Sequence, residues 1–121
     1  MIRHLALLLT LAAGQAAATP TQTAQAEGGP ILTDMAGMAL YTFDNDAPGV
    51  SNCMDACLAN WPALAATADD VAEGDYEVIE RADGTRQWTY KGQPLYTFAK
   101  DEAPGDVTGD GVNEVWHLAR P

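Results

Sequence analysis

The strongest constraint on the fold is an internal repeat in the amino-acid sequence. Residues 37–49 read GMALYTFDNDAPG, and residues 92–105 read GQPLYTFAKDEAPG. Leu, Tyr, Thr, Phe and one Asp match in place, and the second copy has one extra residue before its Pro-Gly pair. We therefore expect two related units that fold together into one compact domain.

Each copy of the repeat has the alternation of a β-strand. Alternate residues of Leu-Tyr-Thr-Phe point to opposite faces, so the Tyr and the Phe share one face, which we expect to be buried. The aromatic residues of this face are Tyr41, Phe43, Tyr96 and Phe98. Asp46 and Asp101 follow at the strand ends, where a carboxylate can accept backbone N–H groups of the Pro-Gly turn.

The segments around the two copies predict one helix and further strands. The helix is expected over residues 51–64, capped by Ser51 or Asn52. The Asp-Gly pair at residues 83–84 indicates a hairpin. The expected strands are residues 31–33, 39–43, 76–80, 86–90, 94–98 and 115–118. The fold class is mainly β with one short helix, a small antiparallel sheet built from two related Leu-Tyr-Thr-Phe-x-x-Asp repeats, in a single domain over residues 30–121.

The N-terminus predicts export. A short positively charged start precedes the apolar run LALLLTLAA at residues 5–13, and small residues follow it, as in a secretory signal peptide. The expected signal peptide is residues 1–18, with an alternative end at 26, and the polar residues 19–29 predict a disordered leader. The apolar run is shorter than the about 20 residues that span a bilayer. We expect a periplasmic or secreted protein with no transmembrane span.

The net charge of −11 excludes two classes of partner. Removal of the signal peptide takes away Arg3 and leaves five Lys and Arg residues. Nucleic acids and anionic membrane surfaces both require clustered positive charge. The partners that we expect are an envelope protein or a small-molecule ligand.

Cys53 and Cys57 are expected to form a disulfide, because export places them in an oxidising compartment. Within one helical turn their Cα atoms come near the roughly 6 Å that a disulfide accepts. Reactive dithiols usually have Cys-x-x-Cys spacing, and a closed zinc site needs four ligands. A redox role for the pair is the alternative to a structural role.

The order of these motifs resembles that of a known family. The residues that carry the likeness include Leu40-Tyr41-Thr42-Phe43-x2-Asp46, Cys53-x3-Cys57-x3-Trp61-Pro62, Asp83-Gly84, Gly92-x-Pro94-Leu95-Tyr96-x-Phe98-x2-Asp101, Gly109 and Trp116. The chain is similar to bacterial secreted-repeat proteins, many of them predicted lipoproteins, that share a Tyr-x-(Phe/Trp/Tyr)-x-x-Asp motif. The resemblance implies export and a repeated unit, and it implies no activity. Because no Cys lies near either expected cleavage point, we expect no lipid anchor.

Two groups of residues are candidates for chemistry. Asp46 and Asp101 form an equivalent carboxylate pair that can bind a metal or act as acid and base, although repetition favours a structural role. Residues 106–111 read DVTGDG, like the front of a calcium loop, but the twelfth position is His117 where a Glu is needed. The weak metal candidates are Asp106, Asp110 and His117. The aromatic residues can also stack a sugar or a flat cofactor.

We interpret the chain as an exported small domain, a non-catalytic binding or structural module of the cell envelope. The sequence shows no Ser-His-Asp set, phosphate-binding Gly loop or basic stripe, so no enzyme activity and no cofactor are expected. One alternative is a metal- or cofactor-binding envelope protein in electron transfer or stress response, with calcium or a transition metal. The other is a thiol-disulfide redox protein that uses Cys53 and Cys57.

Overall fold

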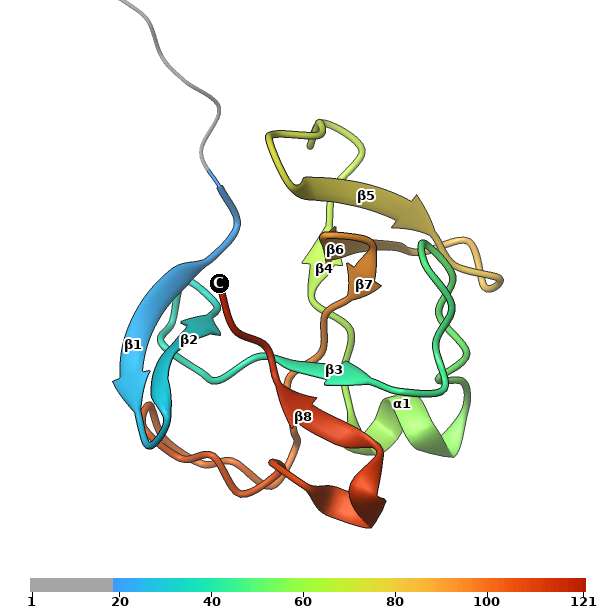
Figure 1. Ribbon diagram of the computed structural model, residues 1–121. Helices are drawn as coiled ribbons and strands as arrows, with labels where there is room; N and C mark the ends of the chain where they lie inside the picture. Colours follow the sequence, from blue (N-terminus) through green and yellow to red (C-terminus); the bar gives the residue numbers. More distant parts are fainter. Residues whose placement is uncertain (1–18) are drawn as a thin grey trace, which may run out of the picture.

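The computed structural model describes residues 19–121, so the expected signal peptide lies outside the described residues (Figure 1). This part of the chain folds into short antiparallel strands and one five-residue helix, which confirms the predicted fold class. The elements are β1 (Gln22–Ala26), β2 (Gly29–Thr33), β3 (Tyr41–Phe43), α1 (Ala56–Asn60), β4 (Ala65–Ala66), β5 (Tyr76–Glu80), β6 (Arg86–Tyr90), β7 (Gln93–Pro94), a 3-10 turn (Val112–Glu114) and β8 (Trp116–Leu118). Within residues 19–121, no helix has the length and apolar character to cross a membrane.

The first lobe contains residues 22–44 and 115–120. Strands β1 and β2 form a hairpin, and β3 pairs antiparallel with β8. Ala119, which follows β8, joins these two pairs, because its N–H donates to the carbonyl of Leu40 at 2.8 Å and its carbonyl accepts from the N–H of Leu32 at 2.9 Å. Leu118 and Ala119 are therefore buried parts of the first lobe.

The second lobe contains residues 60–66 and 76–99 and has the same plan. Strands β5 and β6 form a hairpin, and β4 and β7 pair with β6. Leu64 takes the place that Ala119 has in the first lobe: its N–H donates to Leu95 and its carbonyl accepts from Trp88, both at 2.9 Å. The interval from Leu64 to Ala119 in the sequence equals the interval from Leu40 to Leu95, so one constant offset relates the two lobes.

The two repeats exchange their last strands. The end of the first repeat, residues 60–66, belongs to the second lobe, and the end of the second repeat, residues 115–120, belongs to the first lobe. The lobes meet where the N–H of Tyr41 donates to the carbonyl of Tyr96 at 2.7 Å and the reverse bond measures 3.0 Å. Neither repeat completes a lobe alone, so each lobe needs strands from both repeats.

Both faces of the motif strands are buried. Tyr41 and Tyr96 lie in one apolar cluster, as predicted for the aromatic face. Leu40 and Leu95 point the other way into a second cluster and are equally buried. A strand that is apolar on both sides contributes to two cores, and this suits a domain that is too small for one large core.

The expectation of a disordered leader over residues 19–29 is wrong for most of that segment. Residues 22–26 form β1, which pairs in full with β2. The turn between them is held from outside by Arg120, whose guanidinium donates to the carbonyls of Glu27, Gly29 and Pro30. The polar composition suggested disorder because the partner that orders this hairpin lies at the far end of the chain.

The helix is shorter than expected and begins later. It runs from Ala56 to Asn60, and Asp55 rather than Ser51 or Asn52 occupies the N-cap position, without a side-chain cap. The Ser51 hydroxyl is instead within 2.6 Å of the Tyr96 hydroxyl. A tertiary hydrogen bond therefore takes the side chain that local capping rules assigned to the helix.

The hairpin of β5 and β6 is confirmed, and two other expected strands pair only in part with the strand next to them in the sequence. Residues 31–33 pair mainly with β1 and meet residues 39–43 through one bridge, Thr33–Ala39. The strand expected at 94–98 pairs with β6 only at its start, as β7. Tyr96 then leaves β6 and forms bridges to Tyr41 and Ala63. The exchange between repeats, which no local pattern encodes, replaces these pairings.

Candidate functional site

The repeat motif places each tyrosine against the aspartate of the other copy. The Tyr41 hydroxyl donates to Asp101 at 2.6 Å, and the Tyr96 hydroxyl donates to Asp46 at 2.6 Å. Both tyrosine side chains are fully buried, and Asp101 is 7% exposed. The motif therefore provides a reciprocal pair of hydrogen bonds between the two repeats.

The second oxygen of each aspartate holds the loop that follows it. Asp46 Oδ1 accepts the N–H of Asn52 at 2.6 Å. Asp101 Oδ1 accepts the N–H of Thr108 at 2.9 Å and also its hydroxyl. Each carboxylate thus connects the tyrosine of the other repeat to the loop that follows the carboxylate in its own repeat.

Burial sets the ionisation of these groups. Removal from water raises the pKa of Tyr41 and of Tyr96 well above the ordinary value, and the hydrogen bond to an aspartate raises both further. Burial also raises the pKa of Asp46, an effect that the hydrogen bonds from Asn52 and Tyr96 oppose. The tyrosines therefore remain protonated donors at neutral pH.

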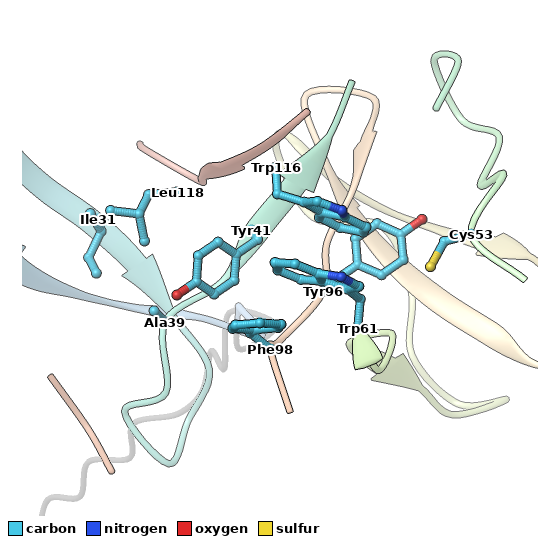
Figure 2. Close-up of a cluster of buried hydrophobic side chains, with 9 residues drawn as sticks. All are labelled: Ile31, Ala39, Tyr41, Cys53, Trp61, Tyr96, Phe98, Trp116 and Leu118. Carbon is cyan, nitrogen blue, oxygen red and sulfur yellow. The ribbon is translucent and has the colours of Figure 1, made fainter. Parts of the chain in front are cut away.

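Four aromatic rings form a column through the centre of the domain. Phe43 stacks on Trp116 with centroids 4.1 Å apart, Trp116 stacks on Trp61 at 3.8 Å, and Trp61 stacks on Phe98 at 4.0 Å. Figure 2 shows the parallel rings of Trp116, Trp61 and Phe98, with Tyr41 beside them. Tyr41 meets Trp61 edge-on, and Tyr96 meets Trp116 edge-on.

The column follows the repeat. The interval from Phe43 to Phe98 equals the interval from Trp61 to Trp116, and it is the same offset that relates the two lobes. Each phenylalanine stacks on the tryptophan of the other repeat. The two tryptophans lie outside the Leu-Tyr-Thr-Phe segment that makes the repeat visible in the sequence. Extending the constant offset along the sequence identifies them.

A buried arginine organises the loop that follows Asp46, which contains Ser51 and Cys53. Arg81 donates to the Ser51 hydroxyl at 2.6 Å, to Gln87 Oε1 at 2.7 Å and to the carbonyl of Cys53. Its side chain is 1% exposed, and its Nε has no hydrogen-bond partner among the described residues. Ser51 in turn contacts the Tyr96 hydroxyl, so Arg81 extends the Tyr96–Asp46 network. Sequence reasoning missed this role, because an arginine next to an Asp-Gly turn looks like a solvent-exposed residue.

The predicted disulfide is present between Cys53 and Cys57, with Cα atoms 5.2 Å apart. Cys53 is fully buried, and Cys57 packs against the same aromatic cluster. The disulfide closes the loop that follows Asp46, beside Arg81. The loop that follows Asp101 in the second repeat contains no cysteine.

The residues of the calcium-like segment have separate structural partners. Asp106 Oδ2 accepts the N–H groups of Glu102 and Ala103, and Asp110 Oδ1 accepts the N–H of Leu118 at 3.1 Å. His117 Nε2 lies 2.8 Å from Asp44 Oδ2 on the surface. The structure does not bring Asp106, Asp110 and His117 together into one ligand set. In the part of the chain from residue 19 onward, no three His, Cys, Asp or Glu side chains form a group that could hold a metal ion.

One end of the aromatic column opens onto a small cleft. Phe43 lines this cleft, of about 160 Å³, together with Asp44, Asp46, Ala47, Pro48, Lys91, Gly92, Gln93 and Pro94. Phe43 is only partly buried, whereas its counterpart Phe98 is 9% exposed. The predicted aromatic face is thus mostly core, and Phe43 is the motif aromatic that borders solvent.

These features define a class of protein: a two-repeat β-domain in which each repeat completes the other. The chain belongs to the family described as a secreted repeat of unknown function, whose model matches residues 22–65 and 77–120. The second match begins at the offset from the first that also relates the two lobes. This confirms the resemblance drawn from the motifs. Comparisons with curated proteins and with solved structures find no match.

Proposed function

We propose that this protein is a non-catalytic binding module of the cell envelope, in which the repeat motif is the scaffold and the cleft beside Phe43 is the binding surface. The observation that carries the proposal is the reciprocal pair of hydrogen bonds, Tyr41 to Asp101 and Tyr96 to Asp46. Through these bonds, the tyrosine hydroxyls and the aspartate carboxylates of the motif pair with each other inside the protein.

A non-catalytic role is supported by the positions of these groups. A general acid or base must come within hydrogen-bond reach of the substrate. The Tyr41 and Tyr96 hydroxyls are on fully buried side chains, and both oxygens of Asp46 and of Asp101 accept hydrogen bonds from the protein. The groups that most resemble an acid–base pair in the sequence serve to hold the two repeats together.

A location outside the cytoplasm is supported by the signal-peptide pattern and by the description of the family as secreted. The 17 acidic residues all lie after residue 18, so the domain carries a strong negative charge after signal-peptide removal. Such a charge keeps a small domain soluble and disfavours anionic surfaces. We place the protein in the periplasm or outside the cell.

The test uses the chain from residue 19 to residue 121, incubated with three preparations from its own host. These are insoluble cell-wall polysaccharide, membrane vesicles and soluble envelope proteins. Co-sedimentation measures the first two interactions, and chemical cross-linking measures the third. Saturable retention on one preparation, with that material recovered unchanged in mass, supports a non-catalytic binding module. Absence of retention on all three, or release of a reaction product, overturns the proposal.

Elemental analysis and a visible absorption spectrum of the protein purified from its host distinguish the metal- or cofactor-binding alternative. A stoichiometric metal or a chromophore would replace the proposal made here. Mass spectrometry with and without a mild dithiol reductant distinguishes the redox alternative. We expect the Cys53–Cys57 bond to resist reduction in the folded protein, because Cys53 is fully buried.

A further inference from the structure

The two ends of the aromatic column differ, although the repeat makes them equivalent. At one end, Gly109 lies against Phe98 and Trp61, so closely that a Cβ on this glycine would come within 2.9 Å of the Phe98 ring. At the other end, Phe43 lines an open cleft. One face of the Phe43 ring stacks on Trp116, which leaves its other face and its edge for a ligand.

The side chains around the open end also differ from their counterparts. Asp44, Lys91 and Gln93 line the cleft at Phe43. The residues at the same places in the other repeat are Ala99, Ala36 and Met38. The surroundings of Phe98 therefore have the same plan without these three polar groups. Asp44 pairs with His117, and the Lys91 ammonium lies 5.2 Å from the centre of the Tyr90 ring. Because the fold forms around Phe98 without any equivalent of these groups, contact with a ligand explains their presence together at the open end.

We infer that the cleft beside Phe43 binds a single pyranose ring of a neutral saccharide. This inference rests on the proposed binding function and names the ligand class. The cleft, at about 160 Å³, is smaller than the roughly 300–1,000 Å³ of sites for drug-sized ligands, so it admits one ring. The apolar C–H face of a pyranose packs on the Phe43 ring, and the exposed Pro48 forms an apolar wall.

The polar rim matches hydroxyl groups. The Asp44 carboxylate is an acceptor, the Lys91 ammonium is a donor, and the Gln93 amide is both. Each hydroxyl of a sugar donates and accepts, so it can pair with any of the three. One Asp44 oxygen already contacts His117, which orients the carboxylate and leaves its second oxygen for a ligand. A sugar can offer hydroxyl groups to all three rim residues at once, whereas a flat ring such as adenine presents its polar groups only in its own plane, which favours a sugar as the ligand.

The experiment titrates the chain from residue 19 to residue 121 with the trisaccharides of N-acetylglucosamine and of glucose, and with adenine as a flat aromatic comparator. Tryptophan fluorescence reports binding because Trp116 stacks directly on Phe43. We expect a saturable change with at least one trisaccharide. We expect about a tenfold weaker affinity in Phe43→Leu, since the stacking face is lost. Met35→Ser, which changes an exposed residue of a different cleft, should bind like the wild type.

A second pair of variants covers the case in which Phe43→Leu fails to fold. Gln93→Ala and Lys91→Ala change exposed side chains of the rim and should keep the wild-type melting temperature. Each should weaken saccharide binding severalfold. Saccharide binding that all three cleft variants leave unchanged overturns the inference while the proposed binding function stands. So does binding of adenine alone, or retention on an envelope preparation without any affinity for saccharides.

Discussion

The hydroxyl of Tyr41 lies 2.6 Å from the carboxylate of Asp101, and the two residues belong to different repeats. The bond is buried, and its equivalent joins Tyr96 to Asp46. Each motif therefore supplies a tyrosine donor to the aspartate of the other copy and an aspartate acceptor for the tyrosine of the other copy. This relationship explains why Tyr and Asp recur together in the repeat, because both hydrogen bonds form only when each copy has both residues.

Removing one tyrosine hydroxyl should destabilise the domain. In Tyr41→Phe the Asp101 carboxylate loses a buried donor, and we expect the free energy of unfolding to fall by about 1.5–3 kcal/mol. Tyr96→Phe should have a similar effect. The control is Tyr90→Phe, because the Tyr90 side chain is only partly buried and its hydroxyl takes no part in the Tyr–Asp bonds, and this change should cost less than about 0.5 kcal/mol. Urea unfolding measures all three, and equal effects would contradict the role of the Tyr–Asp bonds.

Alkaline pH should destabilise the protein. The pKa of Tyr41 and of Tyr96 is raised in the folded state, so above about pH 10 the unfolded chain loses protons that the folded protein keeps. The free energy of unfolding must therefore decrease as the pH rises above this value. Absorbance near 295 nm follows the formation of tyrosinate. As the pH is raised, the folded protein should show this absorbance at higher pH than the protein unfolded in guanidinium, and the absorbance should then rise together with unfolding. Early and complete ionisation with an intact circular dichroism spectrum would be incompatible with buried tyrosine donors.

The close approach of Gly109 to the aromatic column should exclude any side chain there. A Cβ at this position would lie 2.8 Å from Trp61 and 2.9 Å from Phe98, so Gly109→Ala should cost about 1–3 kcal/mol. The near-ultraviolet circular dichroism should also change, because the clash falls on a stacked tryptophan. Gly84→Ala is the comparison: no atom lies within 4 Å of its added Cβ, so the aromatic signal should stay the same even if its positive φ lowers stability. An unchanged aromatic signal in Gly109→Ala would refute the contact.

Cutting the connector between the two repeats should leave the two fragments associated. A protease site inserted after Val71, which is 64% exposed, permits cleavage within residues 67–75. Each fragment carries a last strand that belongs to the lobe of the other, and the disulfide lies within the first fragment. We expect one native species in size-exclusion chromatography and two species in denaturant. Separation of the fragments without denaturant would show that the strand exchange contributes little to stability.

Much of the local structure could be predicted from the residues. The hairpin of β5 and β6 follows from alternation around an Asp-Gly turn, and the disulfide follows from spacing and compartment. The formation of strand β1 could not be predicted, because it depends on pairing with β2 and on Arg120 at the far end of the chain. The role of Arg81 was also hidden, since its partners come from other segments of the chain.

The sequence by itself determined the repeat, the aromatic–acidic motif, the mainly β class and the family. These properties are written in the order and spacing of neighbouring residues, which limit the conformations of each short segment. Only the tertiary structure decided that the repeats exchange their last strands, that each tyrosine bonds to the aspartate of the other copy, and that Phe43 but not Phe98 borders a cleft. The physical reason is that these contacts join residues far apart in the chain, so their energy depends on how both copies pack and not on the pattern within either copy.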